Sequence, residues 1–477
     1  MLDSALEHAS DDDPHLRFDI LLAQESLLDR RGEREHQQQV LDSMVALVDH
    51  LDPARQVQLD LAQSRIQFTH SEYEKAWQHA DRAVEVATEI GDHALRAEAT
   101  LAQGKALTWA AEGEGAQVTL TRAVELAREI GRPALIGEGL RYLSMLASNN
   151  GDFPASLAYF AEAREVFART GDTELESTAL AQVATTYFNL GWHAEAQAAL
   201  EETLPIFRRS GHRYRETVNL GNLASIALMR NQLASAENWA REAVENAEEI
   251  EELEAGADNK LVLGAVATLT SRFEVARTQL ADAISVAHEV HGEALEGESL
   301  ARMSTIELVT GNHEEALDLA RRAVAAAAKV TSELDRGYTQ QALGLAAAAR
   351  GLWDEAENAY AEAQRLFEVL ELESLVREAT VGLGSVAAAR GQVDAAVELI
   401  GPVLEHLDTT GLSQTWEPGQ MLLCCHRILV EADDPRAESV LEQARVYVRA
   451  MAEEIGDPDL AAGYLAYPPH AALLSQH

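Results

Sequence analysis

The chain has 477 residues and a formal net charge of −41, from 79 acidic and 38 basic side chains. Alanine, leucine and glutamate dominate, only 5% of residues are aromatic and proline occurs 11 times, which is typical of a helical protein. Because so negative a surface repels phosphates, we expect neither direct nucleic-acid binding nor membrane binding.

Cysteine usage and the N-terminal segment indicate a cytoplasmic protein. The two cysteines, Cys424 and Cys425, are adjacent and would point in different directions from one helix, so we expect no disulfide framework. Residues 1–14, MLDSALEHASDDDP, are acidic and lack an apolar core of signal-peptide length. No apolar run reaches the roughly 18 residues that a membrane-spanning helix needs.

Taken in order, the chain is predicted to be one solenoid over residues 1–477. Residues 1–53 form an N-terminal capping repeat, in which the acidic segment 10–14 is a plausible helix start. Nine regular repeats follow over residues 54–412. Residues 413–477 hold a last repeat and a capping tail. Stacked repeats of this kind grow without forming separate cores.

The clearest repeat lies between Leu140 and Gly171. The spacing predicts a first helix that ends near Asn149, a turn at Gly151, and a second helix that begins at Pro154. Proline suits the first turn of a helix, and glycine suits the left-handed residue that ends one. One such hairpin cannot bury its own apolar face, so it requires neighbours.

Small residues recur with a period of 40 residues. One column lies late in each second helix: Met44, Ala83, Ala123, Ala163, Thr203, Ala243, Ala283, Ala323, Ala363, Val403 and Ala444. Twelve residues earlier lies a turn column: Gly32, Ser71, Ala111, Gly151, Gly191, Asn231, Ser271, Gly311, Gly351, Gly391 and Ala432. Glycines between repeats keep the same period: Gly91, Gly131, Gly171, Gly211 and Gly411.

A further small column runs through the first helices: Ser64, Gly104, Ser144, Ala184, Ala224, Gly264, Ser304, Gly344, Gly384 and Cys425. Glycine in a helix interior costs up to about 1 kcal/mol relative to alanine. Its recurrence therefore predicts close packing between helices, and Cys425 fits the column as a small buried residue.

These columns resemble the tetratricopeptide repeat (TPR), a helix–turn–helix unit of about 34 residues. A 40-residue period is similar to the TPR-like repeats of MalT-type regulators and of bacterial signalling ATPases of the STAND and adenylate-cyclase-associated kinds. The resemblance covers residues 16–455 and implies an all-α, right-handed superhelix of eleven hairpins. The segment from Gly463 to His470 resembles the tail that closes such arrays, so we expect its apolar residues to cover the last hairpin.

We find no catalytic or cofactor motif. Gly104-Lys105 lacks the preceding glycine of a phosphate-binding loop. His288 and His291 are three apart at a helix end, and Cys424, Cys425 and His426 point around a helix, so neither group predicts a metal site. We expect a protein that is not an enzyme and that binds no cofactor and no metal.

The concave groove is the candidate binding surface, since first helices line it in such arrays. Asn149 and Asn189 share one groove-facing column. The resemblance implies that such asparagines clamp the backbone of an extended peptide, because a carboxamide offers a donor and an acceptor. Alternatively, both merely cap their helices. The other predicted contacts are Arg141, Tyr142, Gln182, Thr185, Asn222 and Met229.

Two further features leave alternatives open. From the fifth repeat onward the same face is apolar, at Leu228, Met229, Leu269, Leu308, Val309 and Leu345. Either a partner helix lies there or a tight superhelix buries this face itself. A basic cluster comprises Arg208, Arg209, Arg213 and Arg215. Either these arginines stabilise a helix C-terminus, where cations are favoured, or they contact an acidic partner or the chain's own acidic surface.

The sequence therefore predicts a non-catalytic scaffold or sensor module of a bacterial regulatory system, which holds a protein or peptide in its groove. Two alternatives remain. The array is a structural homo-oligomer, or it is the excised sensor domain of a signalling ATPase or transcription regulator.

Overall fold

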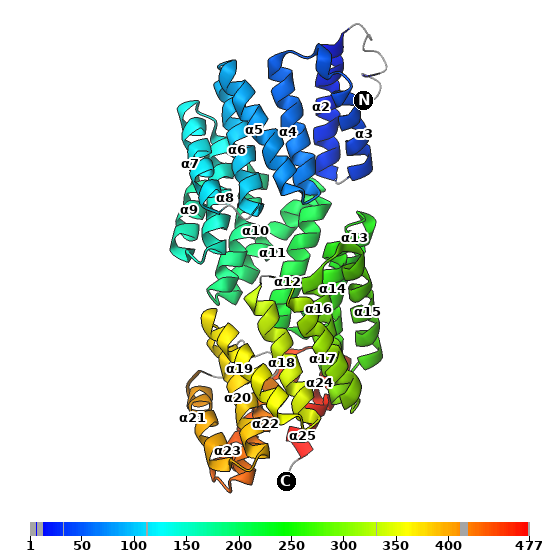
Figure 1. Cartoon of the computed structure of the whole chain (residues 1–477), viewed down its shortest axis with the longest axis vertical. Helices are drawn as coiled ribbons and strands as arrows, with labels where there is room; N and C mark the ends of the chain where they lie inside the picture. The colour runs from blue at the N-terminus through cyan, green and yellow to red at the C-terminus, as the bar shows by residue number, and fades with distance from the viewer. Residues whose placement is uncertain are drawn as a thin grey trace. The chain divides into compact units, whose positions relative to one another are not determined.

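The computed structural model in Figure 1 describes residues 6, 13–31, 33–110, 113–330, 332–410 and 418–475. All regular secondary structure in these residues is helical, as predicted. Eleven helical hairpins follow one another, a short 3₁₀ helix, η1 (Val48–His50), lies between the first two, and two short helices complete the described chain. The first helices are α2 (Pro14–Arg31), α4 (Pro53–Thr69), α6 (His93–Trp109), α8 (Pro133–Asn149), α10 (Thr173–Asn189), α12 (Arg213–Met229), α14 (Leu253–Leu269), α16 (Glu293–Val309), α18 (Glu333–Ala349), α20 (Glu373–Ala389) and α22 (Pro418–Glu431).

Each first helix pairs with the helix that follows it. The second helices are α3 (Arg34–Val45), α5 (Tyr73–Glu89), α7 (Gly113–Glu129), α9 (Phe153–Thr170), α11 (His193–Ser210), α13 (Leu233–Glu249), α15 (Phe273–Val290), α17 (His313–Ala327), α19 (Trp353–Val369), α21 (Val393–Thr410) and α23 (Arg436–Glu454). The tail consists of α24 (Pro458–Ala466) and α25 (Pro468–Ser475). The predicted eleven hairpins are therefore confirmed.

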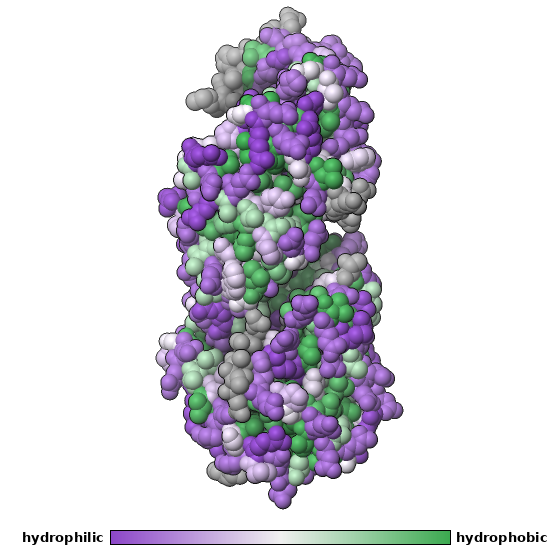
Figure 2. Space-filling model, turned by 90° about the vertical axis from the view of Figure 1, so that its left-hand side faces the viewer, coloured by the Kyte–Doolittle hydropathy of each residue, from purple (hydrophilic) through white to green (hydrophobic). Residues whose placement is uncertain are grey.

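The chain divides into two compact units, Met1–Asn219 and Leu220–His477, called unit 1 and unit 2 below. That the two continue one right-handed superhelix stays a prediction. Hydrophilic side chains cover much of the face in Figure 2, with hydrophobic residues between them, as the charge of the chain leads one to expect.

Left-handed residues end the helices at intervals of 20 residues. The predicted turn column has positive φ at Ser71, Gly151, Gly191, Asn231, Ser271, Gly311, Gly351 and Gly391. The predicted stops at Gly91, Gly131, Gly171 and Gly211 do too. Gly32, Ala111 and Gly411 lie outside the described residues. Ala432 lies in the last turn, as predicted, and the left-handed residue of that turn is Asp433 (φ 51°), whose short polar side chain tolerates this conformation better than alanine.

Two glutamates occupy left-handed positions that glycine would suit better. Glu251 and Glu371 both have φ of 57° and both are exposed. Because a Cβ in this region costs about 1–2 kcal/mol, Glu251→Gly and Glu371→Gly should each raise the free energy of unfolding by about 1 kcal/mol. Urea unfolding measures this. Gly391→Ala (φ 76°) should change stability in the opposite direction, and a loss of stability in either glycine variant would contradict the assignment.

The small column of the first helices packs against the second helix of the same hairpin. A Cβ at Gly104 or Gly264 would lie 2.7 Å from Leu120 or Leu280, respectively. Where serine stands in the column, its hydroxyl donates to a carbonyl twelve residues on, as Ser304 Oγ does to Ala316 O at 2.7 Å. The predicted close packing is thus confirmed, and Cys425 is a fully buried member of the column.

First helices lie on the inner side of each unit. In unit 1, α4 contacts α6, α6 contacts α8 and α8 contacts α10, and in unit 2 α14, α16, α18, α20 and α22 form a similar chain of contacts. Neighbouring second helices are farther apart. Since the more closely spaced layer of a curved stack is its concave side, the first helices form the inner face.

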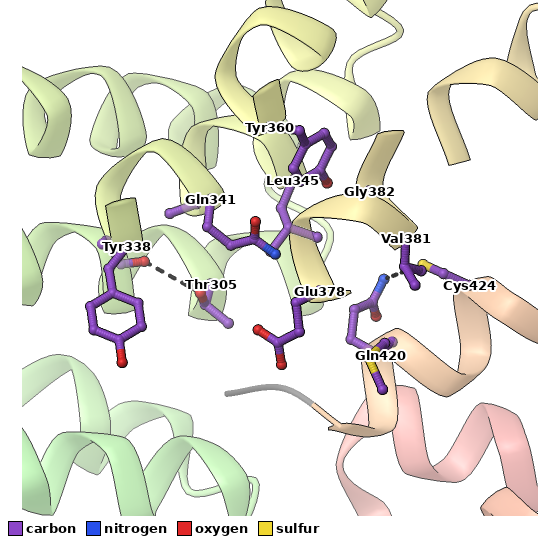
Figure 3. A pocket seen from close by; sticks show the side chains of 13 residues that line it. Thr305, Tyr338, Gln341, Leu345, Tyr360, Glu378, Val381, Gly382, Gln420 and Cys424 are labelled. Atoms are coloured by element: carbon purple, nitrogen blue, oxygen red, sulfur yellow. Dashed lines mark hydrogen bonds between the residues drawn. The ribbon is translucent and has the colours of Figure 1, made fainter. Parts of the chain in front are cut away.

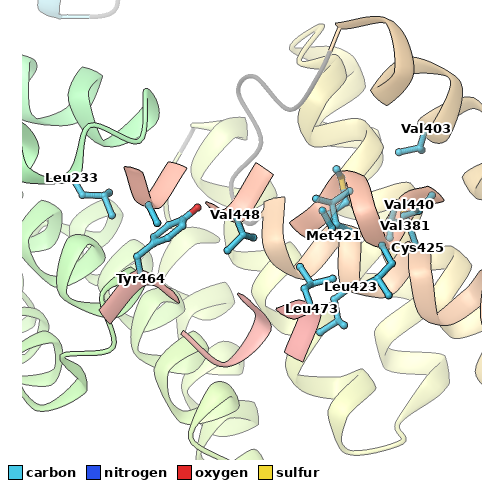
Figure 4. Packing of buried hydrophobic residues seen from close by; sticks show 14 of the residues in the cluster. Leu233, Val381, Val403, Met421, Leu423, Cys425, Val440, Val448, Tyr464 and Leu473 are labelled. Atoms are coloured by element: carbon cyan, nitrogen blue, oxygen red, sulfur yellow. The ribbon is translucent and has the colours of Figure 1, made fainter. Parts of the chain in front are cut away.

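The tail covers more than the last hairpin. As predicted, α25 packs on α22 and α23. In addition, Ser271 Oγ donates to the carbonyl of Gly463 at 2.9 Å, which ties α24 to the turn between α14 and α15. Figure 4 shows Tyr464 of α24 beside Leu233 and Val448 within one apolar cluster of unit 2.

This packing answers the question of the apolar face in unit 2. Leu228 and Leu269 pack against the cluster that contains Tyr464, and Leu308 and Leu345 pack against a neighbouring cluster. The chain itself therefore covers these side chains, while Met229 remains 43% exposed.

His470 makes the tail sensitive to pH. Its ring is buried between Tyr464 and Tyr467, and Nδ1 donates to the carbonyl of Tyr464 at 2.8 Å. Burial lowers the pKa of His470 to about 4, whereas the unfolded chain titrates near 6.5. Below pH 6.5 the unfolded state therefore binds a proton that the folded state does not bind until near pH 4. The free energy of unfolding consequently decreases as the pH is lowered through this range.

We expect His470 to account for a loss of about 3 kcal/mol in unfolding free energy between pH 6.5 and pH 4. The measurement is urea unfolding across this range for the parent chain and for His470→Leu. The variant should show the shallower pH dependence. Identical slopes would mean that His470 titrates alike in both states. His212, whose pKa burial also lowers to about 4, is common to both proteins and cancels in the comparison.

Candidate partner-binding surface

Aromatic and charged side chains follow one another across the inner face of unit 1. We call this set the inner-face row, and it comprises Trp109, Phe68, Lys105, Tyr142, Arg141 and Gln182. Its members come from α4, α6, α8 and α10. Because these are first helices, the row lies where the concave wall was predicted.

Lys105 is held between two rings and a carboxylate. Its Nζ lies 5.8 Å from the ring centre of Phe68 and 5.2 Å from that of Tyr142, within the range of cation–π attraction. Glu138 Oε1 lies 3.4 Å from the same nitrogen. The ammonium group of α6 is therefore fixed by residues of both neighbouring first helices.

Arg141 continues the row toward α10. Its guanidinium carbon lies 4.1 Å from the ring centre of Tyr142, Nη1 donates to Gln182 Oε1 at 2.6 Å, and Nη2 lies 3.8 Å from Glu138 Oε1. The side chain is only 12% exposed, and its Nε has no hydrogen-bond partner among the described residues. A buried donor in the row is thus left without a hydrogen-bond partner among the described residues.

The charges of the row act on one another. Although burial alone would raise the pKa of Tyr142, the cations of Lys105 and Arg141 lower it. Burial likewise opposes ionisation of Glu138, and the same two cations nevertheless lower the pKa of that carboxyl. For Lys105, burial lowers the pKa of the ammonium group, but the attraction of Tyr142 and Glu138 is larger in sum and raises that pKa. The row therefore carries a cationic Lys105 and Arg141 at neutral pH in an otherwise acidic protein.

Trp109 presents an apolar surface at the end of the row. Its ring stacks on Tyr73 at 5.9 Å and meets Phe68 edge-on at 6.5 Å, yet the residue is 47% exposed. A tryptophan that is held rigidly on one side and open on the other is typical of residues that dominate binding energy.

Asn149 and Asn189 are exposed last residues of α8 and α10. Neither side chain makes a hydrogen bond to any residue that the structure describes, so neither caps its helix through its amide. Thr185 is also exposed, on α10. Their predicted contact with a peptide backbone stays a prediction. Asn222 and Met229 are exposed as well, but they belong to unit 2 and are not part of the inner-face row.

The basic cluster pairs mostly with the chain's own carboxylates. Arg208 Nε lies 3.2 Å and Arg213 Nη1 3.3 Å from the buried Glu216. Arg215 lies 3.7 Å from Glu174 and donates to Thr178. Arg209 is exposed. These contacts favour the predicted self-contact over a role reserved for an acidic partner.

Sequence reasoning missed Lys105, Glu138 and Trp192. The sequence did carry a signal for Lys105, because Arg65 stands 40 residues earlier in the same column. Arg65 also pairs across helices, with Glu25 Oε2 at 2.6 Å.

Trp192 lies on the outer side of unit 1 between α9 and α11, stacked on Tyr187 at 5.9 Å and 45% exposed. Open depressions flank it on both sides.

Unit 2 contains a small cavity of about 40 Å³, shown in Figure 3. Thr305, Tyr338, Gln341, Glu378 and Gln420 line it from four inner helices. Gln341 Oε1 is buried without a hydrogen-bond partner in the described chain. Because one water needs about 10–15 Å³, this space suits a few water molecules and is too small for a peptide.

Within the described ranges, no group of three or more His, Cys, Asp or Glu side chains is arranged to hold a metal ion. His426, which follows Cys424 and Cys425, donates a hydrogen bond from Nδ1 to the carbonyl of Ala437 at 3.1 Å. No helix in this part of the chain has the length and hydrophobicity to cross a membrane.

A tetratricopeptide-repeat family model matches residues 136–209 and again residues 176–249. Residues 136–249 are tetratricopeptide (TPR) repeats. The matched span runs from α8 to α13 and contains Arg141, Tyr142 and Gln182. The other hairpins of the chain continue the same 40-residue period outside the match. No curated protein sequence matches it.

Several solved structures are similar to this chain. The apo form of the quorum sensor NprR from B. thuringiensis has a TM-score of 0.51 at 12% identity, covering 73% of this chain and 97% of that one. A Rap protein complexed with competence and sporulation factor has a TM-score of 0.46 at 14% identity, covering 70% and 94%. The STAND protein with a TPR sensor, PH0952 from Pyrococcus horikoshii, has a TM-score of 0.46 at 14% identity, covering 77% and 55%. The similarity to NprR shows that the two chains share a fold. The TM-scores of the other two structures are too low to support a further conclusion.

Proposed function

We propose that this protein is a non-catalytic sensor or scaffold of a bacterial regulatory system, and that the inner face of unit 1 holds a peptide segment of its partner. The observation that carries the proposal is the inner-face row, with an exposed Trp109 at one end and the cations of Lys105 and Arg141 beyond it. NprR, which shares the fold, is a quorum sensor and has also been solved with its cognate peptide NprX.

The chemistry of the row indicates what the segment carries. Trp109 offers an apolar platform, and Lys105 and Arg141 offer cations to carboxylates of the partner. Asn149 and Asn189 have free amides that match the donor and acceptor of a peptide unit. The expected ligand is therefore an extended peptide with one large apolar side chain and one or more acidic residues.

The test is selection from a random-peptide display library on the full chain, followed by measurement of Kd for the selected peptides. Trp109→Ala should weaken binding about 30-fold, the effect of removing an interface anchor worth about 2 kcal/mol. Asn149→Ala with Asn189→Ala should weaken it further. Trp192→Ala is the matched control, since it removes an equally exposed tryptophan outside the row. Loss of binding in Trp192→Ala alone would place the site on the outer face of unit 1 and contradict the proposal.

Self-association into a homo-oligomer, and an origin as the sensor part of a larger regulator, stay predictions. The mass of the chain in solution across a dilution series tests the first of these. A stable oligomer in which Asn149 and Asn189 become protected would contradict an open inner face.

A further inference from the structure

The tail of the chain packs against the turn between α14 and α15 in unit 2. The hydrogen bond from Ser271 Oγ to the carbonyl of Gly463 joins residues 192 positions apart in sequence. At the contact itself, any side chain on residue 463 would overlap the carbonyl of Thr270. The turn between α14 and α15 therefore accepts α24 only because glycine stands there.

The surface that receives α24 is apolar. Leu460 and Tyr464 of the tail belong to one cluster with Leu233 and Val266, which come from α13 and α14. Tyr464 is 2% exposed and Leu460 is 8% exposed. The receiving surface therefore fits a short helix in which a glycine is followed by an aromatic residue and preceded, one turn earlier, by leucine.

The tail is built as a separate helical piece. Gly456 is left-handed (φ 74°) and ends the preceding helical segment. Asp457 then caps α24 by accepting hydrogen bonds from the backbone of Asp459 and Leu460, both at 2.9 Å. With its own cap and a glycine before it, α24 begins as a helix separate from α23.

We propose that the surface of unit 2 formed by α13, α14 and the turn after α14 is a helix-docking surface whose occupant is the chain's own tail. The tail detaches as a unit, and the exposed surface then binds a helix of the same pattern, as the tail of a second copy would supply. This proposal concerns unit 2 and is independent of the peptide site in unit 1.

Detachment is tested on the unmodified full chain by native-state hydrogen exchange in increasing sub-denaturing urea. The amides of α24 should exchange at least tenfold faster than those of α14, with a smaller dependence on urea, because only the tail opens. If the amides of both helices exchange at the same rate with the same urea dependence, the tail is an inseparable part of the unit 2 core and the proposal is wrong.

Docking is tested with Gly463→Leu in the full chain and a labelled peptide of residues 456–475. We expect the variant to lose protection in α24, to keep it in α14, and to bind the peptide at least tenfold more tightly than the parent does. Ala462→Leu, at an exposed position of the same helix, should behave like the parent. A released tail without peptide binding, or loss of protection in α14 as well, would overturn the proposal.

Discussion

Gly344→Ala is expected to lower the free energy of unfolding by about 3 kcal/mol, at the upper end for an added methyl group in a packed core. The added Cβ would lie 2.7 Å from the ring of Tyr360, which is only 2% exposed. The ring cannot retreat, since Gly382 approaches it so closely that a Cβ there would lie 2.5 Å away. Thermal or urea unfolding measures the loss.

A pair elsewhere in the chain supplies the compensating variant. In the repeat formed by α10 and α11, the same two columns hold Ala184 and Leu200, both buried. Gly344→Ala combined with Tyr360→Leu should therefore recover at least half of the stability lost in Gly344→Ala. If the two substitutions destabilise additively, the clash is not between these residues.

Arg141→Ala is expected to weaken binding of a selected acidic peptide about 30-fold, and the effect should shrink as salt is raised. The substitution removes the guanidinium group that rests on Tyr142 and bonds Gln182. Charged hydrogen bonds at a partly buried site contribute more than exposed ones. Isothermal titration at two salt concentrations provides the measurement.

Arg209→Ala is the matched control for charge. It removes one exposed arginine from the same unit, outside the inner-face row. Its affinity should stay within about twofold of the parent at each salt concentration. An equal loss in both variants would mean that the overall charge of unit 1, and not the row, attracts the peptide.

The periodic part of this protein could be predicted from sequence, because each structural role falls on one column. Turn residues such as Gly151 and Gly351 need a left-handed conformation, and Gly104 and Gly264 need space for a facing leucine. Such requirements are local to one hairpin. They recur every 40 residues, so they remain visible without any neighbour being known.

The candidate site was only partly predictable, because it depends on contacts between repeats. Arg141 and Gln182 were both expected on the groove wall, and the structure joins them by a hydrogen bond. Lys105 was missed, since its position depends on the reach of a long side chain toward Tyr142 and Glu138 on the next first helix. No single column encodes such a cross-helix pairing.

The contact of the tail with the α14–α15 turn was unpredictable for a related reason. Whether Gly463 meets Thr270 depends on how much each successive hairpin rotates, summed from α14 to α23. Small residues set each step of that rotation through packing. The sum is a property of the folded stack, which the repeat columns describe only one step at a time.

The most direct test of the proposed function is hydrogen exchange of the full chain with and without a peptide selected from the random library. We predict that protection on binding concentrates in α6, α8 and α10, which carry Lys105, Arg141 and Gln182. Protection confined to α9 and α11 around Trp192, or to unit 2, would contradict the assignment of the inner face of unit 1 as the binding surface.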